Sequence, residues 1–103
     1  MRALTIKEPW ASQIINGQKA TEWRSRVLSS GWYLVHSGAP SSKILGAMKL
    51  SGMATVQDIQ KENDIHLDKW PIPNKIKRII KFKTPIENVK GKIGIWNFQK
   101  QTA

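Results

Sequence analysis

The stretch that decides the fold is RALTIKEPWASQIINGQKATEWR, residues 2–24. Apolar and polar residues alternate over residues 2–7, which predicts a short strand. Pro9 suits the first position of a helix, because its missing N–H would have no partner there. Apolar residues then recur at helical spacing, so we expect a helix over about residues 9–16. Gly17 is a favourable left-handed cap and should end this helix.

The rest of the chain reads mainly as strands, joined by polar loops rich in serine, glycine and proline. Gly46 and Gly52 interrupt one long apolar stretch, where they suit bulges that bend a strand. One short N-terminal helix among so many strands predicts an α+β fold that is mostly β, a small bent sheet closing toward a barrel. The further strands are expected at residues 19–23, 32–36, 44–56, 75–82 and 93–98, with a helical turn within 58–68.

Length and charge restrict the function. The 103 residues (11.7 kDa) are expected to form a single domain, residues 1–103. Seventeen lysines and arginines against seven acids give a net charge of +10 and a pI near 10.2. Such a domain should attract polyanions, above all RNA or another nucleic acid. A hydrophobic fraction of 40% with five tryptophans indicates a folded core rather than a basic tail.

Composition also excludes several classes of site. Without cysteine there is no disulfide, thiol nucleophile or zinc ribbon, and two histidines cannot form a three-histidine metal site. We therefore expect no metal and no cofactor. No apolar run approaches the ~20 residues that span a bilayer, and residues 1–10 lack the apolar core of a secretory signal. The expected location is the cytoplasm, with no membrane partner.

The densest charged cluster is the string Gly17-x-Lys19-x-x-Glu22-x-Arg24. Residues two apart share one face of a strand, so Glu22 and Arg24 should project together while Thr21 and Trp23 point the other way. Lys19 meets Glu22 only if it still belongs to the turn after the helix, which we expect. Such a trio could form a binding or catalytic pocket; the alternative is a solvated charge pair on an exposed strand.

This string stands in a wider pattern that resembles the ASCH domain family of the PUA-like superfamily. The resemblance covers essentially the whole chain. Its motifs are LTIKEPWA (residues 4–11), INGQKATEWR (15–24), LVHS (34–37), ILG (44–46) and GKIGIW (91–96).

The resemblance implies a bent PUA-like barrel of five or six strands, with a cleft between the first helix and the sheet. It implies binding of RNA, or of a nucleotide or modified nucleoside, in that cleft around Lys19, Glu22 and Arg24. Some family members are ribonucleases, and a similar enzyme removes acyl groups from N4-acylated cytidine with a threonine nucleophile. Glu22 occupies that threonine's position here, so the hydrolase alternative is a Lys19–Glu22 pair that activates water.

Further candidates border the expected cleft. His36 could be a general base, because its ordinary pKa lies near neutrality, or a structural strand histidine. Ser37 could bind a phosphate or a base edge. Trp10 and Trp23 could stack on unpaired bases, or pack in the core as we expect for Trp32 and Trp96.

A late basic run lacks any acidic residue between its members. If residues 75–82 form one regular strand, one face should carry a phosphate track while Ile76, Ile80 and Phe82 point inward. Arg26, in the loop after the motif, could extend the positive surface over the cleft. A basic protein-interaction or inhibitory module remains a further alternative. The expected track consists of Lys75, Lys77, Lys81 and Lys83, preceded by Lys69.

Overall fold

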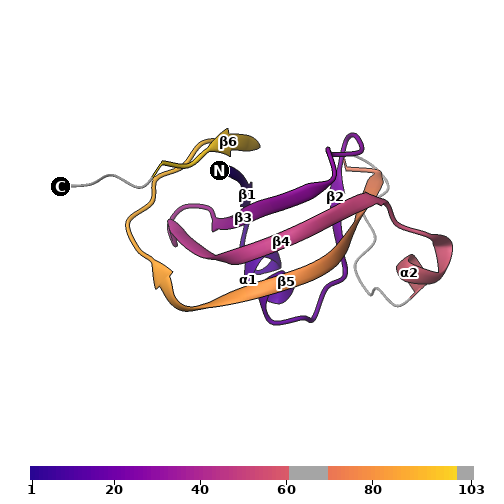
Figure 1. Cartoon of the computed structure of the whole chain (residues 1–103), viewed down its shortest axis with the longest axis horizontal. Coiled ribbons are helices and arrows are strands. Elements are labelled where there is room, and N and C mark those ends of the chain that lie inside the picture. The colour runs from indigo at the N-terminus through magenta and orange to yellow at the C-terminus, as the bar shows by residue number, and fades with distance from the viewer. Residues whose placement is uncertain (61–69, 100–103) are drawn as a thin grey trace.

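The fold is one curled sheet of six strands with two short helices (Figure 1). The structure, a computed structural model, describes residues 1–60 and 70–99. In chain order the elements are β1 (Arg2–Ile6), α1 (Trp10–Ile15), β2 (Thr21–Arg24), β3 (Gly31–Ser37), β4 (Lys43–Met53), α2 (Val56–Gln60), β5 (Ile72–Ile86) and β6 (Ile95–Asn97).

The strands lie in the order β2-β5-β4-β3-β1-β6. β1 pairs with β3 in parallel, while every other neighbouring pair is antiparallel. The parallel pairing places the end of β1 beside the end of β3, so that Ile6 lies opposite Ser37. The expected class, a mostly β, α+β fold with a small bent sheet and an early helix, is confirmed.

Two glycines explain how α1 sits on the sheet. Gly17 adopts φ +74°, the left-handed conformation that turns the chain after the helix. Gly46 in β4 lies under the helix: a Cβ there would collide with the Ile80 carbonyl oxygen and touch the Ile15 side chain. The helix can therefore approach the sheet closely only because this position has no side chain.

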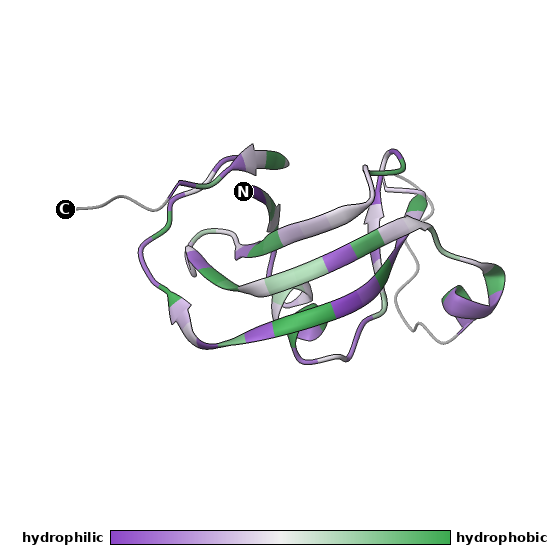
Figure 2. Cartoon of the chain, viewed as in Figure 1, coloured by the Kyte–Doolittle hydropathy of each residue, from purple (hydrophilic) through white to green (hydrophobic). Residues whose placement is uncertain are grey.

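The sheet has two apolar faces. On the face toward α1, Ile14 and Ile15 pack with buried side chains from the strands, Tyr33 and Met48 among them. On the opposite face a smaller cluster forms around Leu34 and is partly covered by the segment that leads into β6. Figure 2 shows apolar and polar stretches along both β4 and β5, the two strands that contribute to both clusters.

Strand β5 departs from the sequence-based expectation. It begins at Ile72 and continues to Ile86, so it is longer at both ends than the strand expected at residues 75–82. Lys49 pairs with Arg78 but Leu50 pairs with Ile76, so β5 carries one extra residue, Lys77. This bulge interrupts the alternation along the strand. The helix α2 covers the start of the expected turn at 58–68, and the rest of that turn lies outside the described residues.

Candidate functional site

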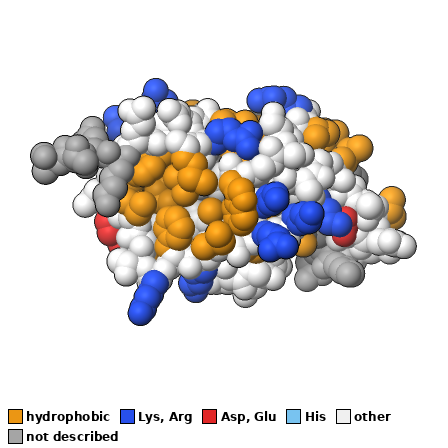
Figure 3. Space-filling model, in the orientation of Figure 1, with side chains coloured by type: hydrophobic (Ala, Val, Ile, Leu, Met, Phe, Trp, Pro, Cys, Tyr) orange, Lys and Arg blue, Asp and Glu red, His pale blue; other side chains and the backbone are white. Residues whose placement is uncertain are grey.

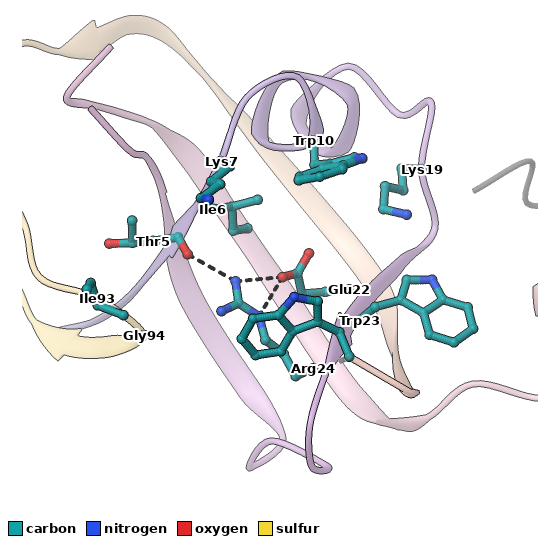
Figure 4. Close-up of a pocket in the computed structure, with 11 residues that line it drawn as sticks. Thr5, Ile6, Lys7, Trp10, Lys19, Glu22, Trp23, Arg24, Ile93 and Gly94 are labelled. Atoms are coloured by element: carbon teal, nitrogen blue, oxygen red, sulfur yellow. Dashed lines mark hydrogen bonds and ion pairs between the residues drawn. The ribbon is translucent and has the colours of Figure 1, made fainter. Parts of the chain in front are cut away.

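A cavity of about 550 Å³ opens beside the end of β1, between α1 and β2 (Figure 4). Its walls come from segments far apart in the sequence: β1 and the turn after it, α1, the turn after α1, β2, and the residues before β5 and β6. The lining residues are Thr5, Ile6, Lys7, Trp10, Lys19, Glu22, Trp23, Arg24, Trp70, Ile93 and Gly94. The Gly-x-Lys-x-x-Glu-x-Arg string thus supplies three charged groups to one cavity.

Lys19 is the most unusual of these groups. It lies in the turn between α1 and β2, as expected, where the conformation of Gly17 directs the chain back toward the sheet. The residue is only 5% exposed, and its Nζ is buried without a hydrogen-bond partner among the described residues. Burying a cation is costly unless another group solvates it, so this ammonium group is poised to bind an acceptor.

Glu22 and Arg24 form an ion pair, as their shared strand face predicts. Arg24 Nε and Nη2 both donate to Glu22 Oε2, at 2.7 and 2.6 Å, and both side chains are mostly buried. Arg24 Nη2 also donates to the Thr5 carbonyl oxygen at 3.0 Å. These contacts hold the guanidinium between β2 and β1, so Arg24 is fixed in place before any ligand arrives.

The charges around the cavity are unequal. Lys7, Lys19 and Arg24 oppose the single carboxylate of Glu22, so the lining residues carry two excess positive charges. Three tryptophans share the walls with these cations. A site that combines an electropositive interior with indole side chains suits an anionic ligand that has a flat ring.

The two residues predicted to point away from Glu22 behave differently. Thr21 is fully buried and does not line the cavity. It is therefore out of reach as a nucleophile. Figure 4 shows the Trp23 indole on the other side of β2 from Glu22 and Arg24, as predicted, although the residue is among those that line the cavity.

His36 lies elsewhere, fully buried between β1 and the segment before β6. Its Nε2 donates to the Val89 carbonyl oxygen at 2.6 Å, since a carbonyl can only accept, and its Nδ1 lies 2.9 Å from Thr5 Oγ1. Trp96 packs edge-on against the ring. With both ring nitrogens engaged inside the protein, the histidine is a structural link and does not border the cavity.

Ser37 is also fully buried, and it serves the start of α1. Its hydroxyl donates to Glu8 Oε2 at 2.7 Å, while Glu8 accepts from the backbone N–H and the hydroxyl of Ser12. Partial burial raises the pKa of Glu8, but the hydrogen bonds from Ser37 and Ser12 outweigh it and hold the pKa below its ordinary value. The serine is engaged in this contact rather than in the cavity.

The late lysines do not form a single track. Lys75 lies 3.5 Å from Asp58, and Lys81 donates to Asn16 Oδ1 at the end of α1. Because Lys77 is the extra residue of the β5 bulge, Ile76 packs toward α1 whereas Ile80 lies on the other face and is 50% exposed. The expectation that both isoleucines point inward is therefore wrong for Ile80.

Of the remaining predicted residues, all but Trp10 lie outside the cavity or outside the described chain. Lys83 and Arg26 are exposed and are not among the residues that line it. Lys69 lies outside the described residues. Trp10 is half-buried in the cavity wall.

Sequence reasoning missed Asn74, a fully buried residue of β5 that supports the site from behind. Its Nδ2 donates to the carbonyl oxygens of Glu22 and Arg26, and its Oδ1 accepts from the Leu28 N–H at 2.8 Å. One side chain thus ties β2 and the following loop to β5. Asparagine is uncommon inside strands, so its presence here is the sequence signal that could have marked this residue as important.

No group of histidine, aspartate and glutamate side chains in residues 1–60 and 70–99 could hold a metal ion. Over the same residues, no helix is both long and apolar enough to cross a membrane. A scan against protein-family models matches none of them, and a search of curated proteins finds no significant match.

Proposed function

We propose that this protein is an RNA- or nucleotide-binding domain of the ASCH type and that the cavity holds one nucleotide unit. The observation that carries the proposal is the Lys19 ammonium group, buried in the cavity wall with no hydrogen-bond partner among the described residues. A phosphate oxygen or a base carbonyl would supply the acceptor that this group lacks.

The other residues of the cavity provide different contacts for a bound nucleotide. Arg24 is oriented by Glu22 and by the Thr5 carbonyl, so it presents a fixed cation to the same cavity as Lys19. The indole of Trp10 offers a flat surface on which a base can stack. The Glu22 carboxylate keeps the cavity from being uniformly positive, which favours a ligand that has donors as well as acceptors.

Calorimetric titration with the four common nucleoside 5′-monophosphates tests this proposal. Lys19→Met keeps the length of the side chain and removes its charge, and we expect it to weaken binding at least tenfold. Lys83→Met, which removes the same charge from an exposed position outside the cavity, should leave mononucleotide affinity within about twofold. Equal affinity in both variants, or no binding by the unaltered protein, would contradict the proposal.

A hydrolase is the second candidate, and the placement of Lys19 and Glu22 in one cavity favours it. In this second candidate the Glu22 carboxylate accepts a proton from an attacking water, and Lys19 stabilises the negative charge that develops on the substrate oxygen. Glu22 then returns that proton to the leaving amine or 5′-oxygen as the acyl–nitrogen or phosphorus–oxygen bond breaks. The reaction would be cleavage of RNA or deacylation of an N4-acylated cytidine, without help from the enclosed His36.

Turnover assays separate the two candidates. Single-stranded RNA and N4-acetylcytidine are incubated with the protein and with Glu22→Gln, which keeps the size of the side chain. Turnover that disappears in Glu22→Gln would establish the hydrolase. Absence of turnover together with retained nucleotide binding would leave the binding domain.

A further inference from the structure

The face of the sheet opposite α1 carries a partly exposed apolar area beside a group of cations. Figure 1 views the sheet from this side, and Figure 3 shows hydrophobic side chains gathered over the strands with lysines and arginines next to them. Residues of β3, β4 and β5 lie on this side of the sheet, and we call them the outer face. They are Trp32, Leu34, Ala47, Lys49, Arg78, Ile80 and Phe82.

Strand register fixes how the outer face is ordered. Trp32 pairs with Lys49, which pairs with Arg78, so an indole and two cations form one row across three strands. The next row holds Leu34, Ala47 and Ile80, because residues two apart along a strand share a face. Leu34 and Ala47 are buried, Ile80 is 50% exposed, and Trp32 and Phe82 are partly buried at the margins of the smaller apolar cluster.

The charged residues of the three strands that form this face are all basic. β3, β4 and β5 contain seven lysines and arginines and no acidic residue. Lys43 and Lys75 approach acidic side chains outside the three strands, and Lys81 contacts an asparagine. Lys49 and Arg78 have no ion-pair partner among the described residues and lie directly opposite each other, an arrangement that destabilises a sheet unless an anion lies between them.

We infer that the outer face is a second nucleic-acid surface, which binds a single-stranded segment across β3, β4 and β5. The phosphates contact Lys49 and Arg78, and unpaired bases stack on Trp32 and cover Ile80 and Phe82. A single strand fits this surface because only unpaired bases expose their flat faces to aromatic side chains. The absence of acidic residues from three adjacent strands favours a polyanion over a protein partner.

This surface extends the proposed function beyond the cavity, and it does not require the cavity to bind a nucleotide. A mononucleotide would occupy the cavity alone, whereas an oligonucleotide could contact both places. The two claims can therefore fail separately.

Fluorescence anisotropy with a labelled twelve-nucleotide uridine RNA, measured over a series of salt concentrations, tests the inference. Lys49→Gln/Arg78→Gln should reduce the slope of log affinity against log salt by about 1.4, the value for two lost phosphate contacts on a single strand. Trp32→Ala should lower the affinity roughly tenfold or more at fixed salt. Thermal melting establishes that each variant is folded.

The control variants either remove the same charge from another part of the surface or alter the cavity. Lys90→Gln/Lys92→Gln, in the exposed loop before β6, should change the slope much less than the outer-face variant. The outer-face variants should bind mononucleotides as the unaltered protein does, and Lys19→Met should reduce the salt slope of RNA binding by no more than about 0.7, the value for one phosphate contact on a single strand. An unchanged slope in Lys49→Gln/Arg78→Gln, or unchanged affinity in a folded Trp32→Ala, would overturn the inference.

Discussion

Two clusters of buried polar side chains meet at Thr5, and they differ in one respect. On one side, the Thr5 hydroxyl contacts His36 and accepts a hydrogen bond from the Trp96 indole. On the other side, the Thr5 carbonyl accepts from Arg24 at the wall of the cavity that includes Lys19. Both clusters hold a titratable residue that the sequence proposes for catalysis. In the first, both ring nitrogens have protein partners; in the second, the ammonium group has none among the described residues.

The difference separates a structural group from a binding group. A buried polar side chain with all its partners inside the protein stabilises the fold and offers nothing to a ligand. A buried cation without a partner lowers stability, and that cost is understandable if a ligand supplies the missing acceptor. Removing the titratable side chain should therefore have opposite effects in the two clusters.

The largest expected effect comes from the satisfied cluster. His36→Ala leaves a void against Trp96 and removes the partner of the Val89 carbonyl oxygen, so we expect a loss of about 3 kcal/mol in the free energy of unfolding. The melting temperature should fall by roughly 10 °C or more. The folded variant should bind mononucleotides with unchanged affinity. A large loss of affinity would contradict the comparison, because it would mean that His36 belongs to the binding site.

Asn74→Ala should have the next largest effect. Its three hydrogen bonds hold β2 and the following loop against β5, and their loss leaves buried backbone groups without partners. We expect destabilisation of about 2 kcal/mol, measured by urea unfolding. Unlike His36→Ala, this variant should also weaken mononucleotide binding, since the Glu22 carbonyl is one of its partners.

How far the sequence predicts the structure depends on how local each interaction is. The Gly17 cap, the turn position of Lys19 and the common face of Glu22 and Arg24 all follow from residues within one turn or one strand. The enclosure of His36 depends on Val89, 53 residues away, and on Trp96. No local pattern indicates whether such a distant carbonyl will reach the ring.

The bulge at Lys77 shows the same limit in the sheet. Alternation predicts one basic face over residues 75–82 only if the strand is regular, and a single extra residue moves Ile80 to the face opposite Ile76. The bulge is defined by pairing with β4, so it belongs to the tertiary structure.

Lys19→Met should have a small effect on stability, opposite in sign to the effects of His36→Ala and Asn74→Ala. Replacing a buried ammonium group that lacks a partner with an apolar side chain of similar length should leave the free energy of unfolding unchanged or raise it by about 1 kcal/mol. Urea unfolding without ligand measures this effect. A loss of stability comparable to that of His36→Ala would mean that Lys19 is a structural group as well.

The smallest expected effect concerns Glu8, a carboxylate that is fully engaged at the start of α1. Its pKa is lowered in the folded protein, so its contribution to stability is present above the pKa of the unfolded chain and is lost as the pH falls through the folded value. Between pH 6 and pH 3 the unaltered protein should lose slightly more stability than Glu8→Gln. Identical pH profiles in urea unfolding would show that the Ser12 and Ser37 contacts contribute nothing.

The measurement that tests the central claim most directly is an NMR titration of the ¹⁵N-labelled protein with uridine 5′-monophosphate, followed through the tryptophan indole N–H signals. Trp10, Trp23 and Trp70 line the cavity, whereas Trp96 belongs to the His36 cluster and Trp32 to the outer face. We expect the three cavity signals to shift together and the other two to stay in place, with no shifts in Lys19→Met. Shifts confined to Trp96 or Trp32, or no shift at millimolar nucleotide, would contradict the assignment of this cavity as the binding site.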